Sequence, residues 1–110
     1  MVRPIPLHLL KDSVTYEEYD SKSRFDDTWK PPVSLRNVRI QEMSSMSIST
    51  IRDHSAFKLL MFYDVVNSKS DNAFNFVEKS KVTYKENVYV VNKVTAVEAF
   101  KLHHYEVELS

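Results

Sequence analysis

The residues Lys81-Val-Thr-Tyr-Lys-Glu-Asn-Val-Tyr-Val-Val91 form two β-rich runs separated by a short polar segment, and this stretch decides the fold. Apolar and polar side chains alternate along the runs with the period of two that is typical of half-buried strands. The pairs that share a face are Val82 with Tyr84, Val88 with Val90, and Tyr89 with Val91. The intervening Lys85-Glu-Asn87 predicts a hairpin turn, with Asn87 at positive φ because Asn tolerates that region better than most non-glycine residues. The stretch predicts a β-scaffold and by itself indicates no activity.

Further strands are predicted on both sides of this hairpin, at Ser13–Tyr19, Val33–Ile40, Ala56–Tyr63 and Tyr105–Leu109. Ala56–Tyr63 is almost uniformly apolar, as expected of a strand buried on both faces. In Val33–Ile40 the apolar phase shifts, and a β-bulge at Arg36-Asn37 would restore a single buried face. The sequence therefore predicts a mainly β domain, a small closed or partly open barrel or sandwich of about six strands.

The connections between these strands are predicted from their polar and turn-forming residues. Asp20–Pro32 is polar, ends in two prolines and predicts a loop. Asp71 is placed to cap a short helix or helical turn over Ala73–Glu78. Thr95–Lys101 is predicted to be a connection that contains Phe100. At most one short helix is expected.

Two regions are candidates for contact with a partner. Residues 1–12 are predicted to be an extended arm, because Pro4 and Pro6 oppose helix formation; the arm either frays or packs on a neighbouring subunit through Ile5 and Leu7. Trp29 either plugs the rim of the barrel or anchors a partner, since tryptophan is enriched at interfaces.

Composition excludes several classes of function. At 110 residues the chain is expected to be one domain, 1–110. It has no cysteine, which excludes thiolate chemistry and disulfides, and no glycine, which excludes glycine-rich phosphate loops. Fifteen basic and fifteen acidic residues cancel, whereas a protein that grips phosphates usually has a net basic surface. No apolar run is long enough to span a bilayer, so a soluble chain without membrane contact is expected.

The segment Gln41–Ser55 is the least ordinary part of the chain, because it is long, rich in Ser and Thr, and uncharged from Met43 to Ile51. Loops of this length inside a compact domain are uncommon and are often functional or disordered. The segment is either a plain surface loop or a binding or gating loop. The residues assigned to a gating role are Met43, Ser44, Ser45, Met46, Ser47, Ile48, Ser49, Thr50 and Ile51, with Arg52 and His54 assigned to an interface.

No catalytic or metal site is predicted. His103 and His104 are adjacent, and adjacent side chains on a strand point to opposite faces, so they could share an ion only if the strand bends. The carboxylate pairs Glu17-Glu18 and Asp26-Asp27 lie in polar stretches and are expected to be solvated surface. No cofactor is expected, and the chain is predicted not to be an enzyme.

A nucleic-acid-binding barrel is the alternative function. Arg36 and Arg39, together with Tyr84 and Tyr89, could form the basic and aromatic face of an oligonucleotide-binding module. The neutral total charge opposes this reading.

Several fragments, in this order, resemble a known family. The most specific are Leu60-Met-Phe-Tyr-Asp-Val-Val-Asn-Ser68 and Leu102-His-His-Tyr-Glu-Val-Glu-Leu109, and the resemblance covers nearly the whole chain. The chain resembles the small minor capsid proteins of tailed phages and prophages of low-GC Gram-positive bacteria, which are taken to be head-completion or head–tail connector proteins of the stopper type. Relatives often have glycine in the hairpin turn, where this chain has Glu86-Asn87.

The resemblance implies a structural role in the virion, with assembly in the host cytoplasm. It implies a homo-oligomeric ring between a portal-adaptor protein above and a tail-completion protein below, around a channel for double-stranded DNA that is not read for sequence. A long loop is expected to point into that channel, and Gln41–Ser55 is the segment that fits. Its stretch from Met43 to Ile51 has no Lys or Arg and would not hold passing phosphates.

Overall fold

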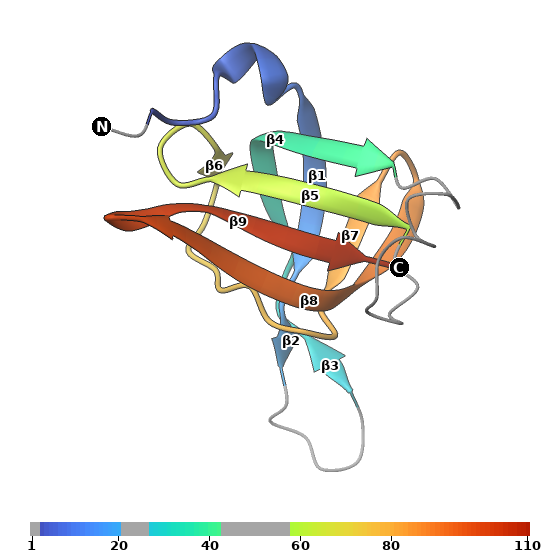
Figure 1. Cartoon of the computed structure of the whole chain (residues 1–110). Helices are drawn as coiled ribbons and strands as arrows, with labels where there is room; N and C mark the ends of the chain where they lie inside the picture. Colours follow the sequence, from blue (N-terminus) through green and yellow to red (C-terminus); the bar gives the residue numbers. More distant parts are fainter. Residues whose placement is uncertain (1–2, 21–26, 43–57) are drawn as a thin grey trace.

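The computed structural model describes residues 3–20, 27–42 and 58–110, and these ranges contain one short helix and nine strands (Figure 1). The elements are the 3₁₀ helix η1 (Leu7–Leu9) and the strands β1 (Asp12–Glu17), β2 (Tyr19–Asp20), β3 (Thr28–Trp29), β4 (Val33–Glu42), β5 (Leu59–Asp64), β6 (Lys69–Ser70), β7 (Lys81–Tyr84), β8 (Asn87–Ala99) and β9 (Lys101–Leu109). The gating residues Met43–Ile51, together with Arg52 and His54, lie outside the described residues.

Six strands close into an antiparallel barrel in the order β1-β7-β8-β9-β5-β4, and pairing of β4 with β1 completes the circle. The short β6 adds to the first half of β4, while β2 and β3 form a separate ribbon below the barrel (Figure 1). The predicted small β-barrel is confirmed. The segment predicted as a loop over Asp20–Pro32 contains part of this ribbon, so that prediction was too simple.

The predicted β-bulge in β4 is confirmed and lies at Asn37. The register passes from Ser13 opposite Arg36 to Asp12 opposite Val38, which leaves Asn37 without a direct partner. Its φ is 57°, a left-handed conformation that Asn tolerates. Because of this extra residue, Leu35 and Val38 both point into the core, as the sequence required.

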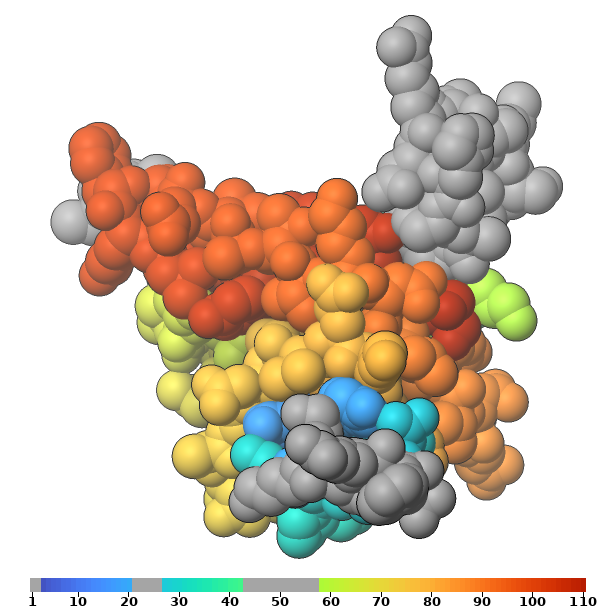
Figure 2. Space-filling model, turned by 90° about the horizontal axis from the view of Figure 1, so that it is seen from below, coloured from blue at the N-terminus to red at the C-terminus, as the bar shows by residue number. Residues whose placement is uncertain are grey.

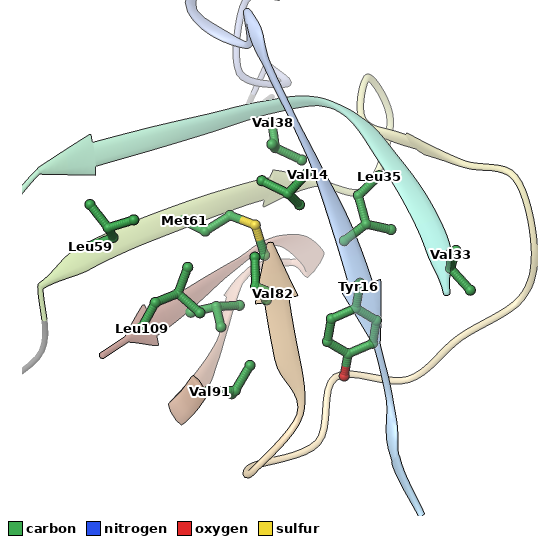
Figure 3. Close-up of a cluster of buried hydrophobic side chains, with 11 residues drawn as sticks. Val14, Tyr16, Val33, Leu35, Val38, Leu59, Met61, Val82, Val91 and Leu109 are labelled. Carbon is green, nitrogen blue, oxygen red and sulfur yellow. The ribbon is translucent and has the colours of Figure 1, made fainter. Parts of the chain in front are cut away.

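The barrel interior is filled by hydrophobic side chains from all six strands (Figure 3). They are Val14, Tyr16, Val33, Leu35, Val38, Leu59, Met61, Val82, Val91, Val107 and Leu109. The segment after β6 is irregular, so the helix predicted over Ala73–Glu78 was wrong. Phe74 and Phe76 of that segment pack edge-on against Tyr16 and Tyr63 instead, and this burial outweighs the local preference for a helix.

The β7–β8 hairpin forms as predicted, with a shorter turn. Tyr84 pairs with Asn87, so the loop contains two residues, Lys85 and Glu86, whose φ values are 49° and 69°. Two residues at positive φ are typical of the type I′ turn that matches the twist of the strands. Asn87 belongs to β8, and its assignment as the positive-φ residue was wrong.

Two other strands differ from their predictions. In β5, Leu59 and Met61 are buried while Leu60 and Phe62 are half-buried, so the strand is not fully buried on both faces. The predicted connection at Thr95–Lys101 is instead strand on both sides of a turn at Phe100, because β8 continues to Ala99 and pairs with β9. The 3₁₀ helix η1 also interrupts the predicted extended arm just after its second proline.

The turn makes a direct prediction. Replacing Glu86 by Gly should raise the free energy of unfolding by about 1 kcal/mol, because a non-glycine residue in the left-handed region costs roughly that amount. The matched change of Asn87 to Gly should lower it by roughly 0.5–1 kcal/mol, because glycine weakens a strand. Urea unfolding measures both, and the opposite order would contradict the turn assignment.

Candidate assembly surfaces

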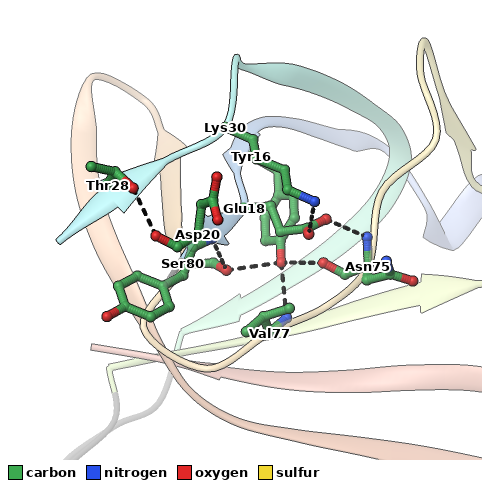
Figure 4. Close-up of polar contacts among 9 residues, drawn as sticks. Tyr16, Glu18, Asp20, Thr28, Lys30, Asn75, Val77 and Ser80 are labelled. Carbon is green, nitrogen blue, oxygen red and sulfur yellow. Dashed lines mark hydrogen bonds and ion pairs between the residues drawn. The ribbon is translucent and has the colours of Figure 1, made fainter. Parts of the chain in front are cut away.

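A buried hydroxyl cluster joins β1 to the segment that precedes β7 (Figure 4). The Tyr16 hydroxyl donates to the Asn75 carbonyl oxygen at 2.6 Å and accepts from the Val77 amide at 3.0 Å. Its oxygen lies 3.0 Å from Ser80 Oγ, which accepts from the Tyr19 amide at 2.9 Å. Burial raises the pKa of Tyr16, so the hydroxyl stays protonated. The cluster thus fixes the start of the β2–β3 ribbon to the barrel.

Glu18 and Lys30 close the base of the same ribbon. The Glu18 carboxylate is only 6% exposed, contacts Lys30 Nζ at 2.8 Å and accepts from the Asn75 amide at 2.6 Å. Burial opposes the charged form, but the hydrogen bonds from Lys30 and Asn75 prevail and lower the pKa of Glu18. The expectation that Glu17-Glu18 is solvated surface was wrong for Glu18, because the partner Lys30 is twelve residues away and gives no local signal.

Trp29 contacts its own chain on three sides. Its Nε1 donates to the Lys79 carbonyl oxygen at 3.0 Å, its ring lies edge-on to Tyr19, and Lys81 Nζ lies 3.8 Å from the ring centroid. These contacts place Trp29 between the ribbon and the start of β7. The ring remains partly exposed. Its role as a partner anchor stays a prediction.

The N-terminal arm is fastened to the outer face of the barrel through its backbone. The Ile5 amide donates to Asp64 Oδ1 at 3.0 Å, and Asn67 Nδ2 donates to the Ile5 carbonyl oxygen at 2.8 Å. Asp64 is fully buried and also accepts from the Val66 and Asn67 amides. Leu7 is 58% exposed and remains available for the predicted subunit contact.

The end of the β8–β9 hairpin is an exposed apolar tip that the sequence did not predict. Phe100 forms the turn with φ 69° and is fully exposed at 103%. The hairpin extends beyond the body of the barrel (Figure 2). Beside it lies a groove of about 480 Å³ whose lining includes Val65, Val66 and Leu102 together with Asp64 and His103. No Gly, Asn or Pro marks this turn in the sequence, so the usual turn signals were absent.

The two ends of the segment assigned to gating leave the barrel side by side. Glu42, the last residue of β4, pairs with Leu59, the first of β5. Gln41 and Glu42, predicted to start the loop, belong to β4. The barrel therefore supplies a paired, antiparallel base for the residues between them.

The proposed nucleic-acid face is not assembled. Arg36 and Arg39 lie on the outer side of β4, whereas Tyr84 and Tyr89 pack against the core. Among the described residues, no three His, Asp or Glu side chains are grouped to hold a metal ion. In the described part of the chain, no helix is long and apolar enough to cross a bilayer.

The fold and these surfaces define a small β-barrel protein that presents a ribbon, an arm and an apolar tip. The chain belongs to the minor capsid protein family, whose model matches residues 6–109. The resemblance to phage minor capsid proteins is thereby confirmed, and this family indicates a structural component of the virion. No curated protein matches the chain.

The Glu18 cluster predicts a pH-dependent contribution to stability. Because the folded pKa of Glu18 lies below its ordinary value of 4.5, its contribution is complete above that pH and is lost as the pH falls through the lowered value. Glu18→Gln should therefore lower the free energy of unfolding by about 1–3 kcal/mol at pH 7 and by much less near pH 3. Glu17→Gln, which removes the same charge one residue away, is the control; equal losses in both variants would contradict the assignment.

Proposed function

We propose that this chain is a head-completion protein of the stopper type at the phage head-to-tail interface. It forms a ring below the portal and its adaptor and above the tail-completion protein, and double-stranded DNA passes through the ring without sequence readout. The family match over residues 6–109 carries the proposal. A head-to-tail ring requires closed cyclic symmetry, with two different surfaces of each subunit in contact.

The role of Gln41–Ser55 in gating is supported by how it is attached and by its charge. Its base is held by the pairing of Glu42 with Leu59, so the barrel fixes where the segment starts and ends. No Lys or Arg lies between Met43 and Ile51, so the segment would not retard DNA through its phosphates. Contacts among copies of the segment around a ring could then close the channel.

The subunit and partner contacts are assigned to two residues of the N-terminal arm, to the tryptophan of the ribbon and to two residues near the end of Gln41–Ser55. They are Ile5, Leu7, Trp29, Arg52 and His54. Of these, Leu7 is the most exposed among the described residues and makes the best first target. Its substitution by Asp should weaken assembly without unfolding the domain, because a surface change away from the core rarely costs more than about 0.5 kcal/mol.

Deletion of Met43–Ile51 tests gating. The variant should fold and assemble into particles, and the filled heads should then lose DNA, because the frame is intact while the closing segment is gone. A variant of unchanged length, with Met43, Met46, Ile48 and Ile51 replaced by Ser, separates loss of apolar contacts from loss of length. DNA retention in filled heads and thermal unfolding of the isolated domain are the measurements. If the deletion unfolds the isolated domain, the segment is part of the core and the gating role fails.

The alternative, a nucleic-acid-binding barrel, has one supporting observation. Lys79 and Lys81 lie over the rings of Tyr19 and Trp29, which contact each other, so these four residues form a small basic and aromatic area. A titration of the isolated protein with DNA at several salt concentrations decides between the two functions. Micromolar affinity with a steep salt dependence would replace the structural proposal.

A further inference from the structure

A second β-bulge, in β9, brings two histidines to one side of the strand. Val97 pairs with His104 and Glu98 pairs with Leu102, which leaves His103 without a partner in the register. The bulge breaks the alternation that would separate adjacent side chains. His103 Nδ1 and His104 Nδ1 consequently lie 2.7 Å apart, with their rings at 80°.

Each imidazole uses its other nitrogen for a contact with an acceptor. His103 Nε2 lies 2.7 Å from the Arg3 carbonyl oxygen, and His104 Nε2 lies 2.9 Å from Glu106 Oε2. A carbonyl oxygen only accepts, and so does an ionised carboxylate. Both Nε2 atoms must therefore carry a proton while Glu106 is ionised, and one further proton must lie between the two Nδ1 atoms.

The chain of three hydrogen bonds thus needs three protons on two rings. Two neutral imidazoles carry only two, so the complete chain holds one extra proton, whose charge the carboxylate of Glu106 balances. If that proton is lost, one of the three contacts has no hydrogen. If a second extra proton is added, two N–H groups face each other at 2.7 Å and the rings must separate. All three hydrogen bonds are therefore formed in only one protonation state of the two histidines.

We infer that His103, His104 and Glu106 form a one-proton switch that fastens the N-terminal arm at Arg3 to the barrel. The arm is also held by the hydrogen bond from the Ile5 amide to Asp64. Loss of the Arg3 contact therefore frees only the residues that precede Ile5. Histidine is the side chain whose ordinary chemistry suits a proton switch near neutral pH. The inference does not depend on the ring or its channel.

Other charged residues lie on the elements next to the histidines. On the elements packed around them, the described ones are Arg3 on the arm, Asp64 on β5, Glu98 on β8, and Lys101 and Glu106 on β9. Asp64 stands opposite His104 in the β5–β9 register, and the Phe62 ring lies 6.0 Å from the His104 ring.

A spin label on the arm tests the switch. The chain has no cysteine, so Arg3→Cys accepts a single nitroxide while keeping the backbone carbonyl that His103 contacts, and His8→Gln in the same protein removes the nearby histidine from the response. The label should be least mobile near neutral pH and should become mobile at both acidic and alkaline pH. In protein labelled with ¹⁵N-histidine, His103 and His104 should take up the first proton together as a coupled pair.

Glu106→Gln provides a response that a merely structural contact would not give. The Gln amide can donate to His104 Nε2, so the chain becomes complete with two neutral imidazoles. This variant should lose the alkaline release of the arm and keep the acidic release, while His103→Phe should leave the label mobile at every pH. An unchanged pH profile in Glu106→Gln, or a label whose mobility in the parent protein does not vary with pH, would overturn the inference.

Addition of zinc tests whether a proton or a metal ion lies between the two Nδ1 atoms. One equivalent of Zn²⁺ at neutral pH should leave the ¹⁵Nδ1 resonances of both histidines unchanged, because the site holds only two ring nitrogens. A stoichiometric shift of both resonances would identify a metal site and overturn the proton switch.

Discussion

Closure of the barrel between β1 and β4 is the constraint on which the rest of this structure depends. These strands pair over most of β1, and the Asn37 bulge lets β4 bend so that its second half can pair with β5. Without the bulge, Val38 would face solvent once Leu35 faced the core. The oxygen and amide of Asn37 are held as well, by Ser68 Oγ and by the Asn67 carbonyl oxygen, so the bulge also fixes the turn after β5. The N-terminal arm binds to this turn through the backbone of Ile5.

Because the chain has no glycine, residues with a Cβ must occupy the positive-φ positions of its turns and bulges. Within residues 3–20, 27–42 and 58–110, five residues occupy the left-handed region: Asn37, Lys79, Lys85, Glu86 and Phe100. Each carries a local cost, which persists only where surrounding pairing determines the backbone. Asn37 lies at a bulge, and Lys85, Glu86 and Phe100 lie in hairpin turns, so the strand register fixes the backbone on both sides of these four residues. Lys79 lies just before β7. Phe100 is the exception in chemistry, since it combines the strain with complete exposure of a large apolar side chain.

The sequence predicted the features that depend on periodicity and not those that depend on long-range partners. Alternation identified the β7–β8 hairpin, and the phase shift between Leu35 and Val38 located the bulge to the pair Arg36-Asn37, of which Asn37 is the extra residue. The Ala73–Glu78 helix failed because Phe74 and Phe76 gain more from the aromatic core than from local hydrogen bonds. Buried Asp64 and Glu18 were missed for a related reason: their partners, Ile5 and Lys30, are distant in sequence or contact them through backbone amides. At the candidate surfaces, Trp29 and the arm were identified by residue type, whereas the Phe100 tip carries no turn signal.

The barrel separates two ends that carry different surfaces. At one end Glu42 pairs with Leu59, and Leu59 pairs with Leu109, so the base of Gln41–Ser55 and the C-terminal residues are held in one ladder. At the other end, five residues along β5, Asp64 binds the N-terminal arm and faces His104. Because β5 and β9 are paired continuously between these ends, the arm can change its contacts while the base of the segment stays in place.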